Sequence, residues 1–203
     1  MEKVDLAKAD KQYYSAGKEP SLVTLGPLAY LAVDGQGTPG EDAFQEAFAA
    51  LYGVAYTTKF HYKLKLGRDY SVAKLEGLYW FPDGGSSIGG TATDGLRWTV
   101  LLRVPEFVEP TEVEAMKADL CAKKESDIYT RVRLDVIAEG LCAQIMHVGP
   151  YSEERETIAR LLAYAEEQGL KPHGPHHEIY MNDPRRTDPS KLRTILRQPV
   201  VKA

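Results

Sequence analysis

Apolar residues recur at helical spacing in the first half of the chain. Phe44, Ala47, Phe48, Leu51 and Tyr52 follow one another at i, i+3, i+4, i+7 and i+8. This pattern predicts an amphipathic helix that begins near residue 41 and runs towards residue 60, with its apolar stripe facing a core.

Two further helices are expected in the second half. One has a helical apolar face made by Ile158, Leu161, Leu162 and Ala165. Ser152 is its expected N-cap, acidic residues in the first turn suit the helix dipole, and Gly169 with Pro172 should end it. The other is a connecting helix that reaches about residue 124, opened by the capping-box pattern Thr-Glu-Val-Glu at 111–114.

Short runs rich in apolar and aromatic residues, closed by Gly, Pro, Asn or Asp, predict strands around these helices. The expected strands cover residues 28–33, 70–81, 96–104, 141–148, 176–182 and 192–200. Strand–helix–strand–strand therefore occurs twice with similar spacing. The residues 82–95 between two of the strands are glycine-rich (PDGGSSIGGTATDG) and are expected to form a flexible hairpin tip or lid.

The repeat predicts the fold class and the domain organisation. We expect an α+β fold in which two strand–helix–strand–strand modules pair about a pseudo-two-fold axis. The antiparallel sheet should carry its helices on one face and a ligand groove on the other. Residues 1–20 are polar and are expected to be an arm outside the core. Residues 21–203 should form one domain, built from module one (about 22–105), the connecting helix (about 110–125) and module two (about 130–201).

Composition and charge narrow the class of protein. The 203 residues are 43% hydrophobic and 27% charged, with a net charge of −4, so no concentrated basic face is expected and no direct nucleic-acid partner. No apolar run approaches the roughly 20 residues of a membrane span, and the first 14 residues are too charged for a signal peptide. With two cysteines, a cytoplasmic location is expected. Twelve tyrosines against five phenylalanines suggest a wet aromatic pocket, or half-buried tyrosines at sheet edges.

Four segments resemble the GyrI-like small-molecule-binding family. They are LYGVAYTTKF (51–60), LEGLYW (75–80), QIMHVGPY (144–151) and HHEIYMNDPRRTDPSKLRTILRQPV (176–200). The family includes effector domains of multidrug-responsive transcription regulators, but the first 20 residues are too short for a DNA-binding helix-turn-helix. The chain is therefore similar to stand-alone members. Some of these bind hydrophobic or cationic compounds, and others are cyclopropanoid cyclopropyl hydrolases, which add water to strained DNA-alkylating toxins.

The resemblance implies that Glu178 is the acidic residue that faces the pocket. In a binding protein it would pair with a lipophilic cation, and in a hydrolase it would be the general base that directs water. A cross-strand ion pair with Arg193 or Arg197 is the competing interpretation. Strand alternation places Tyr180 on the same face as Glu178, where its phenol would donate to a leaving oxygen or would be an ordinary sheet tyrosine. His177 falls on the opposite, core-like face.

The remaining candidates are possible walls of the pocket. They are Tyr30, Tyr79, Trp80, His147 and Tyr151. Alternation does not decide which face of strand 73–81 meets the pocket, and Gly77 within it either admits a ligand closely or marks a bulge. His147 and Tyr151 also have plain structural interpretations, as a satisfied histidine and as packing before a helix. The histidines of HGPHH (173–177) lack zinc-ligand spacing, so no metal and no cofactor are expected.

The main functional prediction is a stand-alone protein that binds hydrophobic, planar or cationic small molecules in an aromatic groove with an acidic residue. The first alternative is a hydrolase of cyclopropane-type toxins that uses Glu178 and Tyr180. The second is a protein-interaction module such as a gyrase inhibitor. A small hydrophobic or cationic molecule is the expected partner, and either a monomer or a homodimer is compatible with the sequence.

Overall fold

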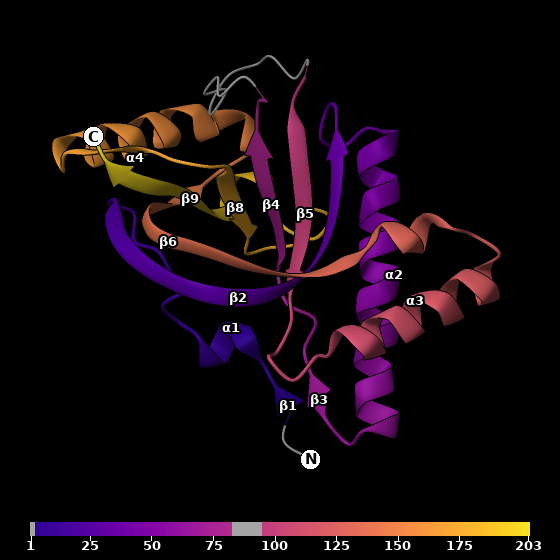
Figure 1. Ribbon diagram of the computed structural model, residues 1–203. Helices are drawn as coiled ribbons and strands as arrows, with labels where there is room; N and C mark the ends of the chain where they lie inside the picture. Colours follow the sequence, from indigo (N-terminus) through magenta and orange to yellow (C-terminus); the bar gives the residue numbers. More distant parts are fainter. Residues whose placement is uncertain (1–2, 83–94) are drawn as a thin grey trace.

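The computed structural model describes residues 3–82 and 95–203, so residues 83–94 of the predicted hairpin tip lie outside the described residues. Its elements, shown in Figure 1, are β1 (Lys3–Val4), α1 (Leu6–Ala9), β2 (Ser21–Gln36), α2 (Asp42–Lys65), β3 (Asp69–Tyr70), β4 (Leu75–Trp80), β5 (Arg97–Arg103), α3 (Pro110–Lys124), η1 (Ile128–Arg131), β6 (Arg133–Val148), η2 (Tyr151–Glu153), α4 (Glu154–Glu167), β7 (Leu170–Pro172), β8 (His176–Tyr180), η3 (Pro189–Lys191) and β9 (Arg193–Lys202).

The main sheet closes on itself as a barrel. Its strands run in the order β6-β2-β5-β4-β8-β9, every neighbouring pair is antiparallel, and β9 pairs again with β6. The short strand β7 continues the sheet beside the end of β9. Strands β2 and β6 are long and strongly curved (Figure 1), and β2 pairs with β6 through its first part and with β5 through its last. Because the sheet is closed, its six main strands have one face inside the barrel and one face outside it.

The order strand–helix–strand–strand occurs twice, as predicted: β2-α2-β4-β5 and β6-α4-β8-β9. Equivalent strands meet where the two modules join, because β2 pairs with β6 and β4 pairs with β8. A pseudo-two-fold axis would produce this pairing. The predicted α+β class with an antiparallel sheet is confirmed.

Helix α2 covers the outer face of module one. Its fully buried Leu51 and Val54 pack in one cluster with Leu31 of β2 and Val100 of β5. Complete burial of one such side chain contributes about 2 kcal/mol. The helix runs on past residue 60 because Tyr62 is still 98% buried in that cluster.

Helix α4 covers the outer face of module two, where Ile158 and Leu161 pack on Ile145 and Leu196. It begins at Glu154, after the 3-10 turn η2, so Ser152 is not its N-cap as predicted. The chain enters through Pro150, and η2 occupies the position that a direct cap would take. Gly169 follows the helix with a φ of +71°, a conformation that glycine adopts without strain.

Helix α3 also begins earlier than predicted. Its N-cap is Glu109 and its first residue is Pro110, which places Thr111 inside the helix. Proline is well suited to the first helical position, because its missing N–H would be unpaired there anyway. No helix within residues 3–82 and 95–203 is long and apolar enough to cross a membrane.

The inner face of the barrel is filled by the polar arm. Tyr13 and Tyr14 are 0% and 5% exposed and pack with Tyr30, Ile179 and Ile195. The prediction that residues 1–20 stay outside the core is therefore wrong for these two tyrosines, which enter because their hydroxyls find buried partners. The face opposite the helices is thus occupied, and the ligand groove predicted there is not on that side.

Candidate functional site

A groove of about 1510 Å³ lies between α2 and α4 and crosses β4 and β8 on the outer face of the sheet. Its aromatic lining comes from α2 on one side, from the strands below and from the start of α4 on the other side. The aromatic residues are Phe44, Phe48, Tyr52, Tyr56, Tyr79, Tyr151 and Tyr180. The helices form its walls, so the groove shares their face of the sheet.

Strand register decides which side chains of β4 reach this groove. Gly77 pairs with Glu178 of β8, and Leu75 and Tyr79 line the groove with Glu178. Glu76 has the opposite phase and points to the inner face. A Cβ on Gly77 would lie 2.6 Å from the Tyr79 hydroxyl oxygen. The glycine therefore makes room for the ring of Tyr79.

Glu178 ends a chain of phenol hydrogen bonds. The Tyr180 hydroxyl donates to Glu178 Oε2 at 2.7 Å, and the hydroxyls of Tyr79 and Tyr180 are 2.6 Å apart. Since Tyr180 donates to the carboxylate, Tyr79 donates to Tyr180. Burial raises the pKa of Glu178 to about 7, while the Tyr180 hydrogen bond and the charge of His177 hold it from rising further. Glu178 can therefore gain or lose a proton near neutral pH.

His176 is the histidine nearest to this carboxylate. Its Nε2 lies 3.6 Å from Glu178 Oε1, and its side chain is 3% exposed. Burial and the charge of His177 lower the pKa of His176 to about 3. His176 is therefore neutral and leaves the negative charge of Glu178 uncompensated.

Glu154, the first residue of α4, is a second acid in the groove and was missed by sequence reasoning. Its residue is 6% exposed. Burial, and then the charge of Glu178, raise its pKa to about 9. The helix dipole favours ionised Glu154 by about 1 kcal/mol, less than one pKa unit, so Glu154 stays protonated at neutral pH.

A signal for Glu154 was present in the sequence. Glu154, Ile158, Leu161 and Ala165 are the buried residues of α4 and lie on one face. An acid at a position in line with the apolar residues of a helix is expected to be buried, whereas an acid elsewhere in the first turn is expected to be exposed. Neither Glu154 nor Glu178 forms an ion pair with a lysine or arginine among the described residues.

The structure brings four of the predicted site residues together: Tyr79, Tyr151, Glu178 and Tyr180 all line the groove. The rings of Tyr151 and Tyr180 meet edge to face at 5.5 Å. Arg197, offered as an ion-pair partner for Glu178, instead lies on the inner face, where it donates to Gln144 and to the Tyr13 carbonyl.

Three predicted pocket residues lie outside this groove. Trp80 has the opposite phase to Tyr79 on β4, and Tyr30 points to the inner face, where its hydroxyl is 2.7 Å from that of Tyr13. His147 is 2.9 Å from the Thr157 hydroxyl and lines a smaller, more open pocket beside the start of α4. Patterns along single strands do not show which strands share a groove.

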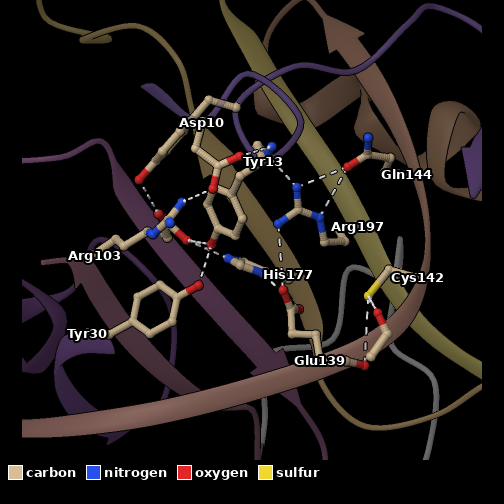
Figure 2. Close-up of polar contacts among 12 residues, drawn as sticks. Asp10, Tyr13, Tyr30, Arg103, Glu139, Cys142, Gln144, His177 and Arg197 are labelled. Carbon is tan, nitrogen blue, oxygen red and sulfur yellow. Dashed lines mark hydrogen bonds and ion pairs between the residues drawn. The ribbon is translucent and has the colours of Figure 1, made fainter. Parts of the chain in front are cut away.

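The inner face holds a buried ionic network that the sequence did not reveal (Figure 2). His177 lies between two carboxylates, 2.9 Å from Glu76 Oε2 and 2.9 Å from Glu139 Oε1. Although burial disfavours the charged ring, Glu139 and Glu76 raise the pKa of His177 to about 9. Glu76 also accepts hydrogen bonds from Tyr13 and Tyr14. The network fixes the arm and places an imidazolium one residue from Glu178.

The described part of the chain contains no set of side chains with the arrangement of metal ligands. No three His, Cys, Asp or Glu side chains gather there in a way that would hold an ion.

The sequence and the fold were compared with those of known proteins. A model of the GyrI-like small molecule binding domain matches residues 99–201. An uncharacterized conserved protein from Listeria innocua superposes with a TM-score of 0.91 at 37% identity, over 98% of this chain and 100% of that chain. A hydrolase from Listeria innocua gives 0.85 at 36% identity over the same shares. The C-terminal domain of EcmrR gives 0.60 at 12% identity, over 91% and 98%, a likeness of fold alone. No curated protein matches the chain.

Proposed function

Because the chain belongs to the GyrI-like small-molecule-binding family, we propose that its groove binds hydrophobic, planar cations and that Glu178 supplies the negative charge. One observation carries this proposal. The buried Glu154 and the largely buried Glu178, whose side chain is 15% exposed, face an aromatic groove, and neither is paired with a lysine or arginine within the described residues.

The physical reason is the cost of a buried charge without a partner. An ionised carboxylate in a poorly hydrated site is stabilised strongly by a cation placed beside it. Tyrosine and phenylalanine faces attract cations and also provide apolar area for a flat ring system. A ligand with a delocalised positive charge satisfies both features of the groove.

The test compares two molecules of the same shape that differ in charge, 1-benzylquinolinium and 1-benzylnaphthalene, by titration calorimetry. We expect the wild type to prefer the cation. Glu178→Gln should weaken cation binding about 10- to 100-fold and leave the neutral compound unchanged, since a charge-assisted contact is worth about 1.5–3 kcal/mol. Glu156→Gln, the same change at an exposed position two residues after Glu154, is the matched control. Equal affinity for both compounds would contradict the proposal.

A second function, hydrolysis of cyclopropane-type electrophiles, is favoured by the two acids whose pKa values are about 7 and about 9. When two acids in one site have different pKa values, the one with the lower pKa can act as the base and the one with the higher pKa as the acid. Glu178 would take a proton from water as its oxygen attacks a cyclopropane carbon. The ring C–C bond would break towards a conjugated carbonyl, whose oxygen would then be protonated. Glu154 suits that last step better than Tyr180, whose pKa is raised well above 10 by burial and by Glu178.

Mass spectrometry separates this activity from binding alone. The protein is incubated with a cyclopropane-bearing alkylator, and the product heavier by one water is measured. A hydrolase should form that product, and Glu178→Gln should slow it by about 10²- to 10⁴-fold while Glu156→Gln does not. If the compound is intact after incubation and calorimetry shows saturable binding, the protein binds this compound without hydrolysing it.

A further inference from the structure

The Glu154 carboxyl group has an unused hydrogen-bonding atom in the groove. Its Oε1 is buried and has no hydrogen-bond partner in the structure, and the residue as a whole is only 6% exposed. Leaving a buried polar group unpaired is costly, and native proteins rarely do so without a reason. Oε1 itself lies towards the Thr194 hydroxyl, which is also unpaired, but Glu154 lines the groove, so a ligand that fills the groove can reach the rest of this carboxyl group.

The two acids are not equivalent. Glu178 is supported as a carboxylate, because Tyr180 donates a hydrogen bond to it and the His177 imidazolium lies on the adjacent residue of β8. Glu154 has no cation of this kind beside it, and the nearby Thr194 hydroxyl only partly offsets the effect of its burial. Since two carboxylates in one dry site do not both stay ionised beside a single positive charge, Glu154 is the one that keeps a proton. A protonated carboxyl is an O–H donor.

We infer that the groove is specific for monocations that also carry a hydrogen-bond acceptor such as a carbonyl, with Glu178 facing the positive charge and the Glu154 hydroxyl donating to the acceptor. This inference rests on the proposed cation-binding function and names its ligand class more narrowly. A dication would instead require both acids to be ionised, and a purely hydrocarbon cation would leave the Glu154 hydroxyl unpaired.

The test uses two permanent monocations of nearly equal shape, 3-acetyl-1-benzylquinolinium and 3-ethyl-1-benzylquinolinium. Wild type should bind the acetyl compound about 3- to 10-fold more tightly, the value of one hydrogen bond of about 1 kcal/mol. Glu154→Gln should keep the preference, because the amide still donates. Glu154→Leu should abolish it, and the exposed Glu156→Gln should leave it unchanged. Thermal melting confirms that each variant is folded.

A second measurement needs no variant. The acetyl preference of the wild type should be present at pH 7 and lost at pH 10, above the pKa of Glu154. Tyr79 and Tyr151, which face Glu154, have pKa values raised above their usual value of 10 by burial and nearby acids. His177, whose pKa is about 9, also loses its charge in this interval, but that change acts equally on two monocations of nearly equal shape, so the ratio of their affinities reports on Glu154. Glu178, with a pKa of about 7, is about half ionised at pH 7 and fully ionised at pH 10, which strengthens the binding of both cations alike and leaves the ratio of their affinities unchanged.

The outcomes separate the two claims. If folded wild type binds neither quinolinium, the proposed cation-binding function falls. If it binds both with equal affinity, or if the preference survives in Glu154→Leu, only the present inference is overturned. Loss of the preference in Glu154→Gln as well as in Glu154→Leu would mean that Glu154 acts as an anion, which also overturns it.

Discussion

Glu154→Gln is expected to stabilise the protein at alkaline pH, although it replaces a buried residue of the candidate site. In the folded chain the pKa of Glu154 is raised from 4.5 to about 9. The unfolded chain releases this proton above pH 4.5, but the folded chain holds it. The stability that the proton provides is complete below pH 4.5 and is lost as the pH rises towards 9. Gln resembles the protonated acid and does not titrate.

The magnitude follows from the span of pH. Each pH unit between the unfolded and folded pKa costs the wild type about 1.4 kcal/mol. From 4.5 to 8 the difference approaches about 5 kcal/mol, an amount that changes the urea midpoint by more than 1 M for an m-value of about 2 kcal/mol/M. At pH 5 the wild type and Glu154→Gln should be nearly equal in stability.

Urea unfolding followed by tryptophan fluorescence measures this, because Trp98 is fully buried and reports loss of the core. Wild type, Glu154→Gln and the exposed control Glu156→Gln would be compared at pH 5, 6, 7 and 8. The gap between wild type and Glu154→Gln should widen steadily with pH, and the control should follow the wild type. Parallel curves for wild type and Glu154→Gln, or a less stable Glu154→Gln at pH 8, would refute the reasoning.

Three further outcomes are expected. Affinity for 1-benzylquinolinium should be constant well above the Glu178 pKa of about 7 and fall below it by about 10- to 100-fold in all, because only the ionised acid attracts the cation; calorimetry of Glu178→Gln should show no such fall. His177→Gln should cost about 3–5 kcal/mol in urea unfolding, since it leaves Glu76 buried without its cation and Glu139 with only Arg197, at 3.6 Å; a loss below 1 kcal/mol would contradict the ionic network. Gly77→Ala should displace the Tyr79 ring and weaken ligand binding, whereas Gly26→Ala, which meets nothing within 4 Å, should bind normally.

Much of the fold was predictable from local patterns. Helical spacing of apolar residues located α2 and α4, and short apolar runs located the strands of both modules. Helix starts were harder, because Pro110 and the turn η2 took the positions that Thr111 and Ser152 were expected to hold. These errors arise because several neighbouring residues are suitable to cap or begin a helix, and the alternatives differ little in free energy.

The candidate site was predictable where it depends on one strand. Period-two alternation correctly put Glu178 and Tyr180 on one face and His177 on the other. It does not show what lies across from them. Glu154 comes from a helix, and Glu76 and Glu139 come from two other strands, 101 and 38 residues from His177. Their meeting depends on closure of the barrel, which is a long-range property.

The position of His177 between Glu76 and Glu139 has a consequence for how the chain folds correctly. A slip of β8 by one residue would turn every side chain of that strand to the other face. Glu178 would then enter an interior that already holds two carboxylates, and Ile179 would leave it for the groove. The loss of the His177 imidazolium and the addition of a third carboxylate oppose this slip, in addition to the loss of apolar burial. The ionic network therefore selects the register of β8, and with it the side of the sheet on which the groove acid appears.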